Sequence, residues 1–462
     1  MSSVSATDTV VHFNDRPNEQ GISHQQRTAI ELSVTGYIPH YAADTLYRTG
    51  PGRYKVDKER GNTFQLDPPK NPDSSTHDMI VYARKTGSLD PCEAMYLKVQ
   101  STYEPRHDST SFINTGKSNA SGGIKPLTAK TDNSTYKQVH HSALEPLATA
   151  TQATFHPELT GPLSASHAYY DPRDWRYIQL QPLFLSSGTP TYRVFRVSIK
   201  TAETSILATF TAPAAYPHSF FLAEDYAIFW SYIEVIKEFD NQIPARWYVV
   251  DRRHCQGLVA VFESPARQGT QTTLFPSQTD IIAECITYEN TDDLHQLYHE
   301  YLVSSSSSGC PEPGAMNNGG KMQTRIARFR LPAIPAASPI LGGEAEKIKP
   351  LIPYTYAVTD RGLSTFVDGV VKFDSLAGKT KIWSEHAQSP REASFVADPD
   401  GNEGYDGVLL NVVLDGRSGR SYLLVLDAGD MKKVGRASVD AAVGFGFHGV
   451  HISGNGVGRV GL

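Results

Sequence analysis

The 462-residue sequence has few cysteines and no excess of positive charge. Its four cysteines lie far apart and form no C-x-x-C pair, which excludes a dense disulfide framework and is typical of reduced thiols. With 43 Lys and Arg against 49 Asp and Glu, the formal net charge is -6, so the basic excess needed to bind a phosphate backbone is missing. We therefore expect a cytoplasmic protein without a nucleic-acid partner.

Signals for secretion and for membrane insertion are also missing. The opening residues MSSVSATDTVVHFNDRPNEQ hold no apolar segment flanked by basic residues, so we expect no secretory leader. The richest apolar stretch, Tyr226–Ile236, is interrupted by Ser231 and Glu234 and is far shorter than the roughly 18 residues that span a membrane. We expect a disordered tail over residues 1–25 and a single domain over residues 26–462.

Short runs rich in β-branched and aromatic residues recur along the chain, bounded by Gly, Pro, Asp and Asn. They predict strands over Ser205–Phe210, Arg246–Val250, Gly257–Phe262, Ile281–Tyr288, Gly407–Val413 and Ser421–Leu426. The last two form the clearest hairpin, because Gly416 and Gly419 between them can adopt positive φ. So many short strands in one chain favour an all-β fold of radially arranged sheets, a β-propeller.

Helical periodicity is scarce in this sequence. The best candidate helix is Thr291–Leu302, in which leucine and tyrosine side chains fall on one stripe. The segments Thr63–Asp78 and Ser304–Gly320 combine proline, glycine and polar residues, so we expect both to be irregular.

Three of the sixteen histidines stand in contexts that differ from the polar surroundings of most others. His167 lies among small residues in PLSASHAYYDP, His218 precedes an apolar patch in YPHSFFL, and His448 lies between glycines in GFGFHGVH. Neutral imidazoles are common ligands of transition metals. Taken singly, however, each histidine is better explained as a hydrogen-bonded core residue than as a ligand.

Taken together, these segments resemble the carotenoid cleavage oxygenase family, and especially its fungal branch. The matching segments include VTGYIPHYAADTLYRTGPGRY, HPELTGPLSASHAYYDP, YPHSFFLAEDYAIF, RWYVVDRRHCQGLVAVFES, PREASFVADPDGNEGYDGVLLNVVLDGRSGRSYLLVLDA and FGFHGVH, in family order over most of residues 33–451. The resemblance implies an iron(II) dioxygenase built on a seven-bladed β-propeller, with short helices and loops that cap a metal site on the axis.

For this chain, the resemblance implies one Fe(II) ion held by histidines from separate blades. His167, His218 and His448 fall on the first, second and fourth ligand positions of the family. Neutral imidazoles leave the iron its positive charge and leave coordination sites open for dioxygen. Glu392, in REASFVADPD, falls on a position whose carboxylate supports catalysis by accepting the second ring N–H of a ligand. The alternative interpretation is that Glu392 is a loop residue whose carboxylate is solvated.

The third histidine ligand of the family is missing from this chain. After the ES of VAVFES, the family continues with two phenylalanines, a Phe-His and an Asn-Ala-aromatic-Glu. Here the residues between Glu263 and Asp280 contain no histidine and no glutamate, so the ligand and its supporting carboxylate are lost together. His254, His295 and His299 do not fall on the family position.

Two further family blocks are replaced or shortened, one soon after Tyr54 and one after Tyr226–Tyr232. Family sequence lies on both sides of each change. This pattern fits an evolved loss and also fits missing or mistranslated exons, and it predicts incomplete blades.

The leading hypothesis is a dioxygenase that uses dioxygen to cleave a conjugated C=C bond of a carotenoid, apocarotenoid or stilbenoid into two carbonyl products. The rival is a catalytically impaired propeller that binds an apolar ligand or a protein partner. A hydrolase lacks support, because no G-x-S-x-G motif occurs. The resemblance also implies an apolar polyene or stilbenoid substrate and a peripheral membrane contact, but no amphipathic helix marks that contact and the oligomeric state stays open.

Overall fold

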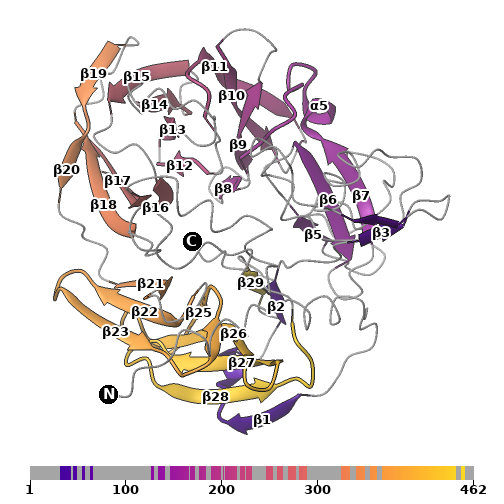
Figure 1. Ribbon diagram of the computed structural model, residues 1–462. Helices are drawn as coiled ribbons and strands as arrows, with labels where there is room; N and C mark the ends of the chain where they lie inside the picture. The colour runs from indigo at the N-terminus through magenta and orange to yellow at the C-terminus, as the bar shows by residue number, and fades with distance from the viewer. Residues whose placement is uncertain are drawn as a thin grey trace.

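Mainly antiparallel sheets, in which only β15 and β19 pair in parallel among the described strands, follow one another around a common centre in the computed structural model of the protein (Figure 1). The structure describes residues 32–42, 45–48, 55–57, 63–65, 126–129, 134–140, 146–165, 167–171, 176–183, 189–198, 201, 203–215, 219–223, 225–231, 246–252, 257–263, 269–276, 280–288, 324–332, 340–348, 354–359, 361, 367–443 and 449–452.

Three neighbouring sheets lie in the upper part of Figure 1. The first, ordered β11-β10-β9-β8, contains β8 (Tyr169–Asp171), β9 (Arg176–Leu183), β10 (Thr191–Ser198) and β11 (Thr204–Thr211). The second, ordered β12-β13-β14-β15-β19, contains β12 (Phe221–Leu222), β13 (Tyr226–Ser231), β14 (Arg246–Asp251), β15 (Gly257–Glu263) and β19 (Ile340–Glu344). The third, ordered β16-β17-β18-β20, contains β16 (Gly269–Pro276), β17 (Ile281–Tyr288), β18 (Thr324–Leu331) and β20 (Glu346–Ile348).

The other sheets lie below and to the right of these three in Figure 1. One contains β21 (Tyr354–Thr359), β22 (Gly369–Asp374) and β23 (Lys379–Trp383). The next contains β24 (Gln388–Pro390), β25 (Ser394–Ala397), β26 (Gly407–Asp415), β27 (Arg420–Asp427), β28 (Lys433–Ser438) and β1 (Ser33–Gly36). Smaller sheets contain β2 (Thr45–Arg48) with β29 (Gly449–Ile452), β3 (Lys55–Asp57) with β4 (Thr63–Gln65), and β5 (Pro126–Ala129), β6 (Thr135–His140) and β7 (Pro146–Thr151).

Helices are short in the described part of the chain, as the sequence predicts. They are α5 (Gln152–Phe155) and the 3-10 helix η2 (His40–Ala42). No helix among these residues is long and apolar enough to cross a membrane. The predicted tail over residues 1–25, the predicted helix Thr291–Leu302 and the irregular segment Ser304–Gly320 lie outside the described residues.

The six predicted strands are confirmed, since each lies within β11, β14, β15, β17, β26 or β27. In the predicted hairpin, positive φ occurs at Gly419 (φ 66°) but not at Gly416. The expectation of an irregular Thr63–Asp78 is wrong for its first three residues, which form β4. These residues precede the prolines of the segment, and Thr63 and Phe64 favour extended backbone.

Strands from the N-terminal and C-terminal parts of the chain pair with one another and close the ring. β1 pairs with β28 in register Ser33 to Ser438, and β2 pairs with β29. The closure depends on two facing glycines: Gly36 has φ +76°, and a Cβ atom there would lie 2.4 Å from the carbonyl oxygen of Val434. A Cβ atom on Gly435 would lie 2.3 Å from the carbonyl oxygen of Tyr37. Glycine is therefore required on both strands for this close approach.

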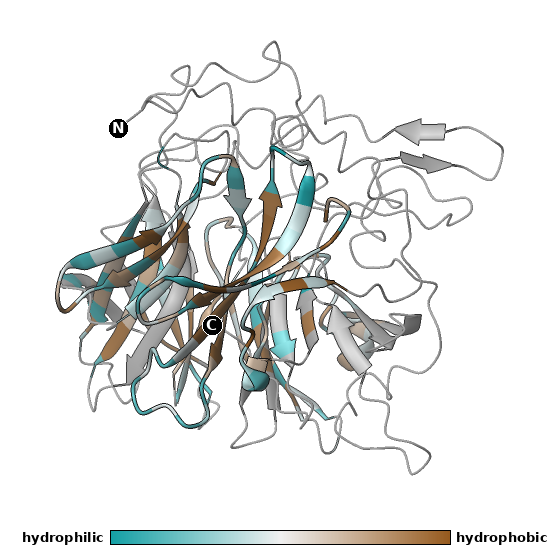
Figure 2. Ribbon diagram, turned by 90° about the horizontal axis from the view of Figure 1, so that it is seen from below, coloured by the Kyte–Doolittle hydropathy of each residue, from teal (hydrophilic) through white to brown (hydrophobic). Residues whose placement is uncertain are grey.

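Hydrophobic cores lie between neighbouring sheets, and hydrophobic stretches run along the strands in Figure 2. Strand β14 contributes side chains to two hydrophobic cores. Trp247 and Val249 pack toward β17 and β18, whereas Tyr248 and Val250 pack toward β10 and β11. Because successive side chains of a strand point to opposite faces, a strand that is buried on both faces needs apolar residues throughout.

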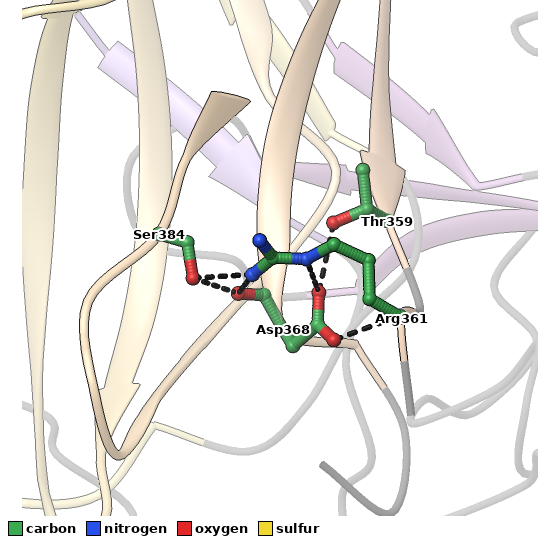
Figure 3. A network of polar contacts seen from close by, with 4 residues as sticks. All are labelled: Thr359, Arg361, Asp368 and Ser384. Carbon is green, nitrogen blue, oxygen red and sulfur yellow. Dashed lines mark hydrogen bonds and ion pairs between the residues drawn. The ribbon is translucent and has the colours of Figure 1, made fainter. Parts of the chain in front are cut away.

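A polar network joins three chain segments at one end of the β21-β22-β23 sheet (Figure 3). The buried carboxylate of Asp368 accepts hydrogen bonds from Thr359 Oγ1 at 2.9 Å, from Arg361 N at 2.8 Å and from Arg361 Nε at 3.0 Å. Ser384 Oγ donates to the backbone carbonyl of Asp368 at 2.8 Å. The network fixes the point where β21 ends, β22 begins and β23 ends.

Replacing Asp368 with asparagine should lower the free energy of unfolding by about 1–3 kcal/mol, because one amide oxygen cannot satisfy all three donors. The matched control is Asp440→Asn, which breaks the exposed ion pair between Arg420 and Asp440 and should cost about 0–1 kcal/mol. Urea denaturation of both variants measures the difference. Equal losses in the two variants would contradict a stabilising role for the buried carboxylate.

Candidate metal centre

The three predicted histidine ligands lie just before strands of separate sheets. His167 lies two residues before β8, His218 three residues before β12, and His448 directly before β29. These strands lie toward the centre of the ring in Figure 1, and β8 and β12 are end strands of their sheets. In a propeller, segments that lead into the innermost strands lie near the axis. His218 and His448 lie outside the described residues, so the convergence of the three imidazoles stays a prediction.

His167 is half-buried and follows a tightly packed loop. Ala165 N donates to Leu180 O at 3.0 Å, which docks the loop on β9. A Cβ atom on Gly161 would lie 2.3 Å from the carbonyl oxygen of Pro182. The small residues before His167 therefore allow a close approach of the two backbones.

A network of buried amide side chains stabilises the loop that precedes His167. Gln152 Nε2 donates to Tyr136 Oη at 2.9 Å and to Ser164 Oγ at 2.8 Å, while Gln181 Nε2 donates to Gln152 Oε1. Gln181 Oε1 in turn accepts from Gly161 N at 3.0 Å. Because both glutamine side chains are fully buried, these bonds hold the loop before His167 in one conformation.

The backbone of Glu392 is connected to the strand that follows His448. Arg48 Nη1 donates to Glu392 O at 2.8 Å, and Arg48 pairs in register with Gly449. Burial lowers the pKa of Arg48, and the nearby negative charge of Glu392 acts in the opposite direction. Glu392 itself is exposed, and the predicted hydrogen bond from a ligand ring nitrogen to its carboxylate stays a prediction.

Sequence reasoning missed the residues that support Glu392. Arg391 is buried, its Nη2 donates to Val443 O, and its own N–H donates to Asn411 Oδ1 at 3.0 Å. Burial lowers the pKa of Arg391, and the charge of Arg48 lowers it further. One signal in the sequence could have indicated this support. Asn411 is a polar residue inside the apolar run GVLLNVVL, and such a residue needs buried hydrogen-bond partners.

The predicted donor set, three imidazoles, would suit Fe(II). Imidazole nitrogens are typical ligands of non-haem iron, and the loop before His167 is fixed by buried hydrogen bonds, as a rigid site requires. Among the residues that the structure describes, no three His, Cys, Asp or Glu side chains gather in a metal-binding group. Two of the three predicted ligands lie outside those residues, so this result leaves the site untested.

Comparison with known proteins identifies the family. Residues 75–453 match the family described as retinal pigment epithelial membrane protein. The carotenoid dioxygenase of Neurospora crassa is 30% identical over an alignment of 563 positions that covers 95% of this chain and 92% of the relative. The torulene dioxygenase of Gibberella fujikuroi is 30% identical over 94% of this chain and 93% of the relative.

The fold is similar to solved structures of Synechocystis apocarotenoid oxygenase. One variant superimposes with a TM-score of 0.63 at 17% identity, covering 97% of this chain and 99% of that chain. The cobalt-substituted enzyme gives a TM-score of 0.60 at the same identity and coverage. The predicted fold class is thus confirmed as a seven-bladed β-propeller. The chain belongs to the carotenoid cleavage oxygenase family.

Proposed function

We propose that the protein is an iron(II)-dependent dioxygenase-like protein that cleaves a conjugated C=C bond, and that it binds iron more weakly than an intact relative. The carotenoid class of substrate is preferred over stilbenoids, because the curated relatives are named carotenoid and torulene dioxygenases. The observation that supports the proposal most strongly is that, in the sequence, His167, His218 and His448 each come one to three residues before a strand of a different sheet.

The proposed reaction balances without an external reductant. The C=C bond and the O–O bond break, and each carbon atom takes one oxygen atom, which gives two carbonyl products. Bound Fe(II) would supply the activation of dioxygen. The neutral imidazoles of the three histidines would hold the metal, and the carboxylate of Glu392 would accept the second ring N–H of His448. His448 is the preferred partner because Arg48 connects Glu392 to the strand that begins at Gly449.

We further propose a cytoplasmic location and a peripheral membrane contact for the uptake of the apolar substrate. Cys285, the cysteine that lies in the described part of the chain, is buried as a free thiol. A reduced thiol is in keeping with a cytoplasmic compartment.

Weak iron binding follows from the sequence that precedes β16. In the other three sheets, a histidine lies one to three residues before the strand. The corresponding positions before β16 are Ala266, Arg267 and Gln268, none of which supplies an imidazole. The alignment with the Neurospora relative has 563 positions for a chain of 462 residues, so at least 101 positions have no counterpart here. This shortfall supports the loss of internal blocks, by evolution or through missing exons.

Iron analysis of the purified protein after anaerobic reconstitution tests the proposal. Alanine at His167, His218 or His448 should remove most of the retained iron in each case, because two imidazoles alone bind iron poorly. His156→Ala is the matched control, since this histidine accepts a hydrogen bond from Glu158 N at 3.3 Å outside the proposed site. Retention of iron by all three alanine variants would overturn the proposed centre. Incubation with carotenoid and stilbene panels under oxygen then tests cleavage.

Replacing Glu392 with glutamine should weaken iron retention by about 10- to 100-fold, because the amide cannot hold the ligand ring as a carboxylate does. The control is Glu385→Gln, whose carboxylate pairs with Lys433 at 3.5 Å on the surface of the same sheet. Competition with a coloured chelator measures both affinities. If Glu392→Gln retains iron as tightly as the control does, Glu392 has no role at the metal.

A further inference from the structure

The turn between β24 and β25 contains a buried arginine directly before Glu392. Arg391 is 1% exposed, although a guanidinium is charged at neutral pH and is costly to bury without partners. Its Nη2 donates to the carbonyl oxygen of Val443, which precedes His448 by five residues. Arg391 therefore connects the turn that contains Glu392 to the segment that leads to His448.

Asn411, in the middle of β26, fixes the backbone of this arginine. Its side chain is fully buried, its Oδ1 accepts from Arg391 N at 3.0 Å, and its Nδ2 donates to Arg391 O. One amide thus satisfies both backbone polar groups of Arg391. Rotation of the turn would leave a buried N–H and a buried C=O without partners, which is costly.

A second connection lies on the other side of His448. Arg48 Nη1 donates to Glu392 O at 2.8 Å, and Arg48 faces Gly449 in the pairing of β2 with β29. Val443, before His448, is therefore bonded to Arg391 directly, and Gly449, after His448, is connected to Glu392 through its strand partner Arg48.

We propose that Arg391 and Asn411 are positioning residues of the metal centre. They hold the turn with Glu392 against Val443, five residues before His448, and would thereby keep the carboxylate at a fixed separation from the ligand ring. The inference rests on the proposed roles of His448 and Glu392. Neither Arg391 nor Asn411 touches the metal in this account.

Cobalt(II) is the probe for the test, because its visible d–d spectrum reports ligand geometry independently of catalysis. Arg391→Met keeps the length of the side chain but removes its donors, and should weaken Co(II) binding by about 10- to 100-fold with a changed spectrum. Arg391→Lys keeps a charged donor and should recover part of the affinity. It also serves as the second variant if the methionine variant fails to fold.

The matched control is Arg436→Met, in the same sheet. This arginine stacks on the ring of Tyr422 at 3.6 Å, so its loss should lower thermal stability and leave Co(II) affinity unchanged. Glu392→Gln should add little to the loss already caused by Arg391→Met, because residues that act through one another are not additive.

The outcomes separate the inference from the function on which it rests. If His448→Ala weakens Co(II) binding but Arg391→Met and Arg391→Lys match the unmodified protein in affinity and spectrum, only the inference fails. A loss in Arg391→Met that is no larger than in Arg436→Met also overturns it. Full Co(II) affinity in His448→Ala would overturn the metal centre and the inference together.

Discussion

Insertion of the family's third-ligand segment between Glu263 and Asp280 should raise iron affinity and carotenoid cleavage together. By supporting the inserted histidine, the inserted glutamate should account for about 10- to 100-fold of the gain, as carboxylates that support a ligand histidine do. The inserted histidine should add more, since it completes the four-imidazole set that the family resemblance implies. Iron titration and product analysis of the unmodified and inserted proteins measure both effects.

The control for this experiment is the same insertion with alanine in place of its histidine. It restores chain length and should recover little iron affinity. If the unmodified protein already binds iron stoichiometrically and cleaves a polyene as fast as the inserted protein, the third histidine was never needed. In that case the account of a weakened centre is wrong.

Replacement of Trp247 by alanine should lower the free energy of unfolding by about 3–5 kcal/mol, the largest stability effect expected here. Trp247 is fully buried, and its ring centroid lies 5.4 Å from that of Phe221 and 5.5 Å from that of Phe329. It therefore fills the space between two neighbouring sheets. Urea denaturation with Trp247→Phe as the control checks the prediction, because phenylalanine keeps most of the contact and should cost much less. A cost below about 1 kcal/mol for the alanine variant would contradict an essential core position.

Local sequence pattern predicts the strands well but not the way in which the ring closes. Runs of β-branched and aromatic residues locate strands such as β17 and β26 because extended backbone suits those side chains. The pairing of β1 with β28 joins residues about 400 positions apart, from Ser33 to Ser438. It depends on the fit of Gly36 against Gly435, which neither segment reveals by itself.

For the candidate site, too, one part can be predicted from the sequence and another part cannot. The histidines are found from their local context and from the family resemblance, because ligand positions recur in short motifs. The support around them comes from contacts between distant segments, such as Arg391 with Asn411, twenty residues away. Asn411 signals a buried hydrogen bond by interrupting an apolar run, but the sequence does not say which residue is its partner.

X-ray absorption spectroscopy of the iron-loaded protein tests the central claim most directly, because scattering from imidazole rings counts the histidine ligands. We expect three imidazoles in the unmodified protein and four after insertion of the third-ligand segment. A spectrum with no imidazole contribution, or with four imidazoles already in the unmodified protein, would contradict the claim.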